Sequence, residues 1–271
     1  MSLPPSHLPA EAELTASPSA FSVYRTIFAE GLAELARSGQ SLFWSGLAAG
    51  LSMGFSLLGE GLLGTYLPDE PWKPLITKFG YAFGFVVVIL GRQQLFTENT
   101  VTPIFPLFSE PSCRRAYKVA RLCTIVLVGN LLGACLFALI LHHTQPLTAE
   151  AREEFLKVAS KAMHDDAWRH FYGGIFAGWI VATIVWLLPF AGPSKVVIVS
   201  AFTYLIGLGG FSHIIAGTVE AAYVWLGTSA SLWSLVGGVL LPTLLGNTLG
   251  GVALVAAINH AQAGGRDIDG N

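Results

Sequence analysis

An imidazole and a hydroxyl each stand at a polar interruption within a long apolar stretch. His213 ends the interruption at residues 209–213, and Thr97 lies in the interruption at residues 91–100. An imidazole can exchange a proton with a weak acid or hydrogen-bond an anion, and a threonine hydroxyl can both donate and accept. We therefore predict that Thr97 relays a hydrogen bond to His213 on a transport path. The alternatives are a histidine satisfied within an apolar core and a threonine that caps the next short helix. The neighbouring residues predicted to line the same path are Leu95, Phe96, Asn99 and Ser212.

Arg92 and Glu98 place charges beside the first interruption. A single charge at bilayer depth costs about 2.5–3.5 kcal/mol on insertion scales. A pair between Arg92 and Glu98, or between Arg92 and either Glu220 or Glu60, would offset this cost. We favour such a pair as a brace for the interruption over direct contact of these charges with a substrate.

Two asparagines occur in matching Gly-Asn-x-x-Gly motifs. Asn130 lies in residues 129–133 and Asn247 in residues 246–250. An amide can bridge a donor and an acceptor, so we expect each asparagine to hold backbone groups that an interruption frees. The small residues around them permit close helix packing.

The elements that position these residues are predicted from hydropathy. Hydrophobic residues make up 53% of the chain and charged residues 12%, whereas soluble domains carry about 25% charged residues. The apolar runs are each near the roughly 20 residues that a helix needs to cross a bilayer. We predict an all-α integral membrane protein with six spanning segments, of which the second and the fifth are broken. The segments are residues 41–67, 74–90 with a short continuation past the interruption, 117–142, 168–190, 195–226 and 232–258.

The six segments form two copies of a three-segment unit, residues 41–142 and 168–258. A unit with three crossings inserts its second copy upside down, which gives an inverted repeat. In such architectures the substrate path lies near the midplane, where the two broken helices meet. Breaking a helix in hydrocarbon leaves costly backbone groups unless they are buried in protein or line a pore. Two breaks at equivalent positions therefore predict a transport path.

The regions outside the bilayer are polar. Residues 1–20 are rich in Pro and Ser and are predicted to be disordered, and residues 259–271 form a polar tail. Residues 21–40 predict an amphipathic helix that anchors on the membrane surface, with packing on the bundle or a gate at the pore mouth as alternatives. Residues 148–163 predict an extramembrane helix. The loops on the side of the termini carry more Lys and Arg, which places both termini in the cytoplasm.

Several classes of function find no support in the sequence. The net charge of −2 comes with no Lys/Arg stripe of the kind that binds nucleic acid. Cys113, Cys123 and Cys135 lack metal-ligand spacing, and the last two lie in an apolar run. No nucleophile–base–orienter group is recognisable, so we expect no enzyme activity, no metal and no cofactor.

The motifs of the interrupted segments resemble those of the formate/nitrite transporter family. Residues 91–97 resemble the family's glycine leading into Leu-Phe-Thr, and Phe211-Ser212-His213 with Ala216-Gly217 resembles its central histidine motif. Residues 177–186 resemble its fourth-helix signature. The resemblance covers about residues 41–258, and the run 91–100 is most similar to the YfdC-like branch.

The resemblance implies a homopentamer of aquaporin-like protomers in a cell inner membrane. Each protomer would pass a small monovalent anion, such as formate or nitrite, or its conjugate weak acid, often with a proton. His213 would match the family's central histidine and Thr97 the threonine of its broken second helix. Tyr81 and Ile206 would lie near its apolar constrictions, and Lys161 near its outer-vestibule lysine.

The sequence also departs from the family pattern. Ser212 replaces an acidic residue, and Gly178 and Gly217 replace asparagines. Arg92 and Glu98 add charges where formate and nitrite members are largely neutral. We expect a channel or proton-linked transporter for a small monovalent anion. A channel for water or another small neutral solute and a non-conducting membrane scaffold are the alternatives.

Overall fold

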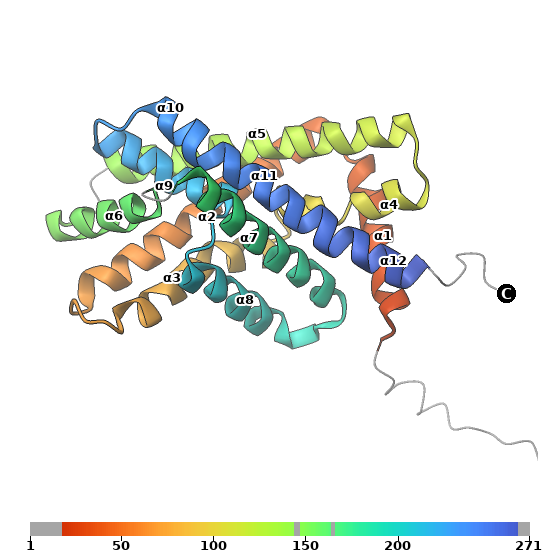
Figure 1. Cartoon of the computed structure of the whole chain (residues 1–271), viewed down its shortest axis with the longest axis horizontal. Helices are drawn as coiled ribbons and strands as arrows, with labels where there is room; N and C mark the ends of the chain where they lie inside the picture. Colours follow the sequence, from red (N-terminus) through yellow and green to blue (C-terminus); the bar gives the residue numbers. More distant parts are fainter. Residues whose placement is uncertain (1–17, 144–146, 164–165, 265–271) are drawn as a thin grey trace, which may run out of the picture.

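The computed structural model describes residues 18–143, 147–163 and 166–264, all of whose regular elements are helical (Figure 1). Most of the predicted disordered N-terminus and the last part of the predicted tail lie outside these residues. The main helices are α1 (Ala20–Ala36), α2 (Gly39–Tyr66), α3 (Lys73–Leu90), α4 (Ile104–Ser109), α5 (Cys113–His143), α6 (Ala149–Ala162), α7 (Ala167–Leu187), α8 (Lys195–Gly209), α9 (Ile214–Gly227), α10 (Leu232–Ser234), α11 (Leu241–Leu249) and α12 (Ile258–Gly264). Short 3₁₀ turns are η1 (Glu98–Thr100), η2 (Leu188–Phe190) and η3 (Gly192–Ser194), and π-helical stretches are η4 (Leu235–Leu240) and η5 (Gly250–Ala257).

Six helical stretches are long and apolar enough to cross a membrane, which confirms the all-α membrane fold predicted from hydropathy. They are Gly39–Tyr66, Lys73–Leu90, Cys113–His143, Ala167–Phe190, Gly192–Gly209 and Leu232–Ala263. The last of them continues past residue 258, where the polar tail was predicted to begin. Many large apolar side chains on these helices are exposed in the single protomer, as expected for surfaces that face lipid or neighbouring subunits.

The two halves of the chain interlock. α2 packs on α3 and α5, and α7 packs on α8 and α11, while α3 contacts α8 across the halves. Close packing needs glycine where backbones touch: a Cβ on Gly178 would lie 2.7 Å from the Cα of Asn247. An asparagine at position 178, as in the family pattern, would therefore not fit between α7 and α11 without a shift.

The two halves run in opposite directions through the bundle. We call the end where α1 and α12 pack together the α1 side, and the end formed by α6 the α6 side (Figure 1). α3 begins on the α6 side, where Lys73 pairs with Glu154 of α6 at 2.9 Å. α8 begins on the α1 side, where Lys195 and Glu30 of α1 line one cavity. Each of these helices stops within the bundle, and the chain continues toward the opposite side.

α3 and α8 are closed in the same way at their inner ends. The N–H of Gln93 donates to the carbonyl of Val88, and the N–H of Phe211 donates to the carbonyl of Ile206, each at 3.0 Å. Both bonds span five residues, which is the pattern of a Schellman closure. The closures stop the two helices at equivalent points and so define the two breaks.

Each closure requires one residue in the left-handed backbone region. Gly210 has a φ of 63° at the end of α8. We expect Gly210→Ala to lower the free energy of unfolding by about 1 kcal/mol, because a Cβ is strained at positive φ although nothing lies within 4 Å of it. Thermal unfolding in detergent would measure the change. Gly217→Ala is the matched control: its Cβ also meets nothing within 4 Å, but Gly217 is helical, so a gain of up to about 1 kcal/mol is expected. Equal effects of the two substitutions would contradict the role of φ.

α1 packs on the bundle. It contacts α4, α12 and η2, and the side chains of Tyr24 and Ile27 are buried. The Tyr24 hydroxyl lies 2.6 Å from Ser109 Oγ and 2.8 Å from His260 Nδ1, and burial raises the pKa of Tyr24. The structure thus shows the packed alternative, whereas a surface anchor was favoured from sequence.

Candidate functional site

Asn130 holds the backbone of the first break. Its Oδ1 accepts from the N–H of Phe96 at 2.9 Å, and its Nδ2 donates to the carbonyls of Gln94 and Gly46, each at 2.8 Å. Asn130 is fully buried, so no water can replace these bonds. One amide therefore satisfies the freed donor and acceptor and ties them to α2.

Asn247 holds the second break with the same geometry. Its Oδ1 accepts from the N–H of Ile214 at 2.8 Å, and its Nδ2 donates to the carbonyls of Ser212 and Gly174 at 2.9 and 2.8 Å. The two asparagines thus make corresponding bonds in the two halves. This correspondence places the two breaks in equivalent positions.

The two breaks meet at Thr97 and His213. Thr97 Oγ1 lies 2.9 Å from His213 Nε2, and both residues are buried. The backbone N–H of Ala216, which can only donate, lies 3.4 Å from His213 Nδ1. Nδ1 must therefore accept, so we assign the neutral tautomer in which Nε2 carries the proton and donates to Thr97. The Thr97 hydroxyl keeps its own proton for another acceptor.

Aromatic and aliphatic side chains surround this contact. The rings of Phe85 and His213 form a T-shaped contact with their centroids 4.8 Å apart. The ring centroids of Tyr81 and Phe85 lie 5.5 Å apart. Leu95, Phe96, Tyr81 and Ile206 are all buried. Phe85 was not among the residues singled out from sequence, although it lies one helical turn from Tyr81 on the same face of α3.

Other polar partners of the breaks also went unrecognised in the sequence. Ser212 Oγ lies 2.9 Å from Nδ1 of the buried His170. Asn99 Nδ2 donates to Gln94 Oε1 at 3.1 Å, and both side chains are buried. Ser212 and Asn99 therefore support the breaks through His170 and Gln94.

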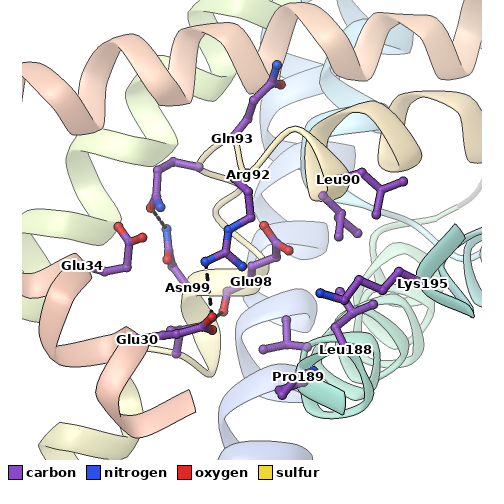
Figure 2. A pocket seen from close by; sticks show the side chains of 14 residues that line it. Glu30, Glu34, Leu90, Arg92, Gln93, Glu98, Asn99, Leu188, Pro189 and Lys195 are labelled. Atoms are coloured by element: carbon purple, nitrogen blue, oxygen red, sulfur yellow. Dashed lines mark hydrogen bonds and ion pairs between the residues drawn. The ribbon is translucent and has the colours of Figure 1, made fainter. Parts of the chain in front are cut away.

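A cavity of about 150 Å³ opens beside the first break on the α1 side (Figure 2). Its polar lining includes Glu30, Glu34, Arg92, Glu98, Asn99 and Lys195. Figure 2 shows the side chain of Arg92 between Glu30 and Glu98, with the ion pair drawn to Glu30.

The structure corrects the predicted partner of Arg92. Arg92 Nη2 pairs with Glu30 Oε1 at 3.2 Å, and no ion pair joins Arg92 to Glu98, Glu220 or Glu60 within the described chain. Arg92 still lies close enough to Glu98 for the two charges to interact. The Arg92 side chain is 75% exposed, so it carries its charge at an open cavity.

Glu220 was predicted beside the break, but in the structure it lies away from it. Glu220 lies close enough to Glu60 and Lys78 for their charges to interact, and Glu60 pairs directly with Lys78. Lys161 of α6 is exposed and also acts electrostatically on Glu60. These groups form a charged cluster on the α6 side. Tyr81 lies close enough to this cluster to interact electrostatically with Glu220 and Glu60.

We expect Lys78→Met to lower the free energy of unfolding by about 2 kcal/mol. Glu60 is 3% exposed, and its Oε2 already lacks a hydrogen-bond partner among the described residues, so losing Lys78 strands a buried carboxylate. Urea or thermal unfolding in detergent would measure the loss, and adding Glu60→Gln should recover much of it. Lys157→Met should change little, because the Lys157 side chain is 57% exposed and Glu154 keeps its pair with Lys73. A similar loss in both variants would contradict this explanation.

No group of three or more His, Cys, Asp or Glu side chains that could hold a metal ion occurs in residues 18–143, 147–163 and 166–264.

Known proteins share this sequence and architecture. Residues 22–261 match the sequence model described as formate/nitrite transporter. Inner membrane protein YfdC of Escherichia coli (strain K12) is 38% identical over 243 residues, which cover 90% of this chain and 78% of that protein. The solved structure of an "FNT family ion channel" aligns with a TM-score of 0.77 at 20% identity, over 89% of this chain and 98% of the other. A "pentameric formate channel with formate bound" aligns with a TM-score of 0.71 at 19% identity, over 83% and 97% of the two chains.

Proposed function

We propose that this chain, which belongs to the formate/nitrite transporter family, passes a small monovalent anion or its conjugate weak acid through the junction of its two breaks. The observation that carries the proposal is the buried contact of Thr97 and His213, which joins the breaks of two oppositely directed halves. His213 donates its proton to Thr97, so the Thr97 hydroxyl keeps a proton that it can offer in an otherwise apolar passage.

The surroundings of this junction favour a neutral form of the permeating species. Transfer of a weak acid's anion into an apolar throat raises the pKa of that acid, because desolvation penalises the charged form. The anion then takes a proton and crosses as the neutral acid. Thr97, whose hydroxyl accepts from His213, can donate its own proton to an oxygen of the passing species.

The relatives support a proposal for assembly and location. One structural neighbour is a pentameric formate channel, and we propose that this chain also assembles as a homopentamer. A relative is named as an inner membrane protein, and we propose the same membrane for this chain, with both termini in the cytoplasm. The α1 side would then be the cytoplasmic side. We further propose that the protein has no enzyme activity.

The test is a flux assay in proteoliposomes with formate, nitrite, hydrosulfide and acetate at several pH values. The proposal expects flux of at least one of these acids, rising as pH falls toward the pKa of that acid. Complete absence of weak-acid flux from correctly assembled protein would overturn the proposal. Water or neutral-solute flux without any dependence on pH would favour a neutral-solute channel instead.

The structure gives no reason to prefer a sealed scaffold. A scaffold would need Arg92 and Glu98 to lock the break, whereas Arg92 turns to Glu30 at an open cavity. This arrangement supports our proposal that the charged residues line the approach to the junction.

A further inference from the structure

Arg92 occupies a backbone conformation that favours glycine. Its φ is 55°, the only positive value at a non-glycine residue in the part of the chain that the structure describes. At the equivalent closure of α8 the residue is Gly210, with a φ of 63°. The two closures are otherwise alike, so the fold itself needs no side chain at position 92. An arginine there is strained relative to glycine, and such strain at a cavity points to a function for the side chain.

The side chain of Arg92 projects into the cavity on the α1 side. Lys195 at the start of α8 lines the same cavity, so two cations come from the two halves of the chain (Figure 2). The carboxylates that line it are Glu30, Glu34 and Glu98. Glu34 pairs with Arg37 at 3.0 Å, so the charge of Glu34 is balanced by an arginine at the end of α1.

In the ion pair between Arg92 and Glu30, another anion can replace the carboxylate of Glu30. The pair is a single contact of 3.2 Å, with side chains that are 75% and 39% exposed. Exposed pairs of this kind contribute little stability, so another anion can replace the carboxylate at small cost. Glu30 lies on α1 and can turn to solvent, whereas the backbone of Arg92 is fixed by the closure of α3.

We propose that Arg92 is the recognition group for planar monovalent anions with two oxygens on one atom at the α1-side mouth, where the anion displaces Glu30. A guanidinium presents parallel N–H donors that match two oxygens of a carboxylate or of nitrite, and a lysine ammonium does not. This inference rests on the proposed function and adds to it the first binding step and its residue. Lys195, which comes from the second half of the chain, adds electrostatic attraction for the anion.

The test measures flux from each face separately. Proteoliposomes are sorted by whether protease reaches an N-terminal tag, and formate is varied on one face at a time. Arg92→Gln should raise the half-saturating concentration of formate at the α1 face about tenfold, the effect of losing one charge-assisted bond. The half-saturating concentration at the α6 face should not change. Arg114→Gln, at an exposed arginine on the same side, is the matched control and should change neither.

Three further variants separate recognition from structure. Glu30→Gln should lower the half-saturating concentration at the α1 face, because the competing carboxylate is gone. Arg92→Lys should keep the attraction but lose the preference for formate over hydrosulfide, which has no pair of oxygens to match the guanidinium. Arg92→Gly should raise the unfolding temperature yet weaken formate binding at that face.

The outcomes separate this inference from the function on which it rests. If the wild-type protein carries no weak acid, the proposed function fails and this inference fails with it. If it carries formate but Arg92→Gln leaves the α1-face value unchanged, or shifts both faces equally, only the inference is overturned. A fall in unfolding temperature for Arg92→Gly would overturn the strain argument.

Discussion

Replacing Asn130 with leucine is expected to lower the free energy of unfolding by about 3 kcal/mol, because it strands buried backbone groups of the first break. Leucine has a similar shape but neither a donor nor an acceptor. The N–H of Phe96 and the carbonyl of Gln94 would lose the bonds they make to the amide, and neither is part of a regular helix. Thermal or denaturant unfolding of the protein in detergent would measure the loss.

The second break offers an internal repetition of this experiment. Asn247→Leu removes the corresponding bonds to Ile214 and Ser212 and should cost a similar amount. Asn259→Leu is the control, since the Asn259 amide donates only to Val255 of its own helix. A loss at Asn259 as large as at Asn130 would show that the asparagines act through bulk or polarity and not through the backbone of the breaks.

Much of this architecture is legible in the sequence because it depends on local signals. Apolar runs of membrane length, proline and glycine at their interruptions, and the repeated Gly-Asn motif each act within a few residues. The same signals place Asn130 and Asn247 beside the breaks whose backbone they bind. The opposite direction of the two halves follows from counting three crossings.

Arg92 and Glu98 lie beside the break as predicted, but the ion-pair partner of Arg92 was predicted wrongly because it depends on tertiary packing. Arg92 pairs with Glu30, 62 residues away on α1, whose docking on the bundle has no local signal. Glu220 illustrates a different error, since it follows His213 by seven positions on α9. A helix rises about 1.5 Å per residue, so this spacing moves Glu220 about 10 Å from the break. The helical rise alone would have assigned it to the α6 side.

The structure also explains the glycine at position 178, for which the sequence alone gives no reason. Gly178 departs from the family's asparagine, and in the structure it lies against the backbone of Asn247. The departure therefore has a packing cause in this chain. Arg92 is the reverse case, because a glycine would suit its backbone and the sequence holds an arginine instead.

Replacing His213 with asparagine is expected to reduce weak-acid flux by at least about tenfold while leaving the protein folded. His213 has two separate tasks: Nδ1 accepts from the N–H of Ala216 at the start of α9, and Nε2 donates to Thr97. Asparagine is a good N-cap and can take over the first task, but it is too short to reproduce the second. Loss of one positioned donor at the junction of the breaks accounts for a tenfold or greater effect.

Three companion variants show whether the loss of flux comes from the helix cap or from the hydrogen bond between His213 and Thr97. His213→Phe removes both tasks and should reduce flux and stability together. Thr97→Ser keeps the hydroxyl and should retain flux, whereas Thr97→Val has the same shape without the hydroxyl and should lose flux as His213→Asn does. Proteoliposome flux of formate or nitrite, with assembly checked by size-exclusion chromatography, measures all four. Full flux in a folded His213→Asn protein would show that the histidine serves only to cap α9, and the passage would then depend on desolvation without a polar relay.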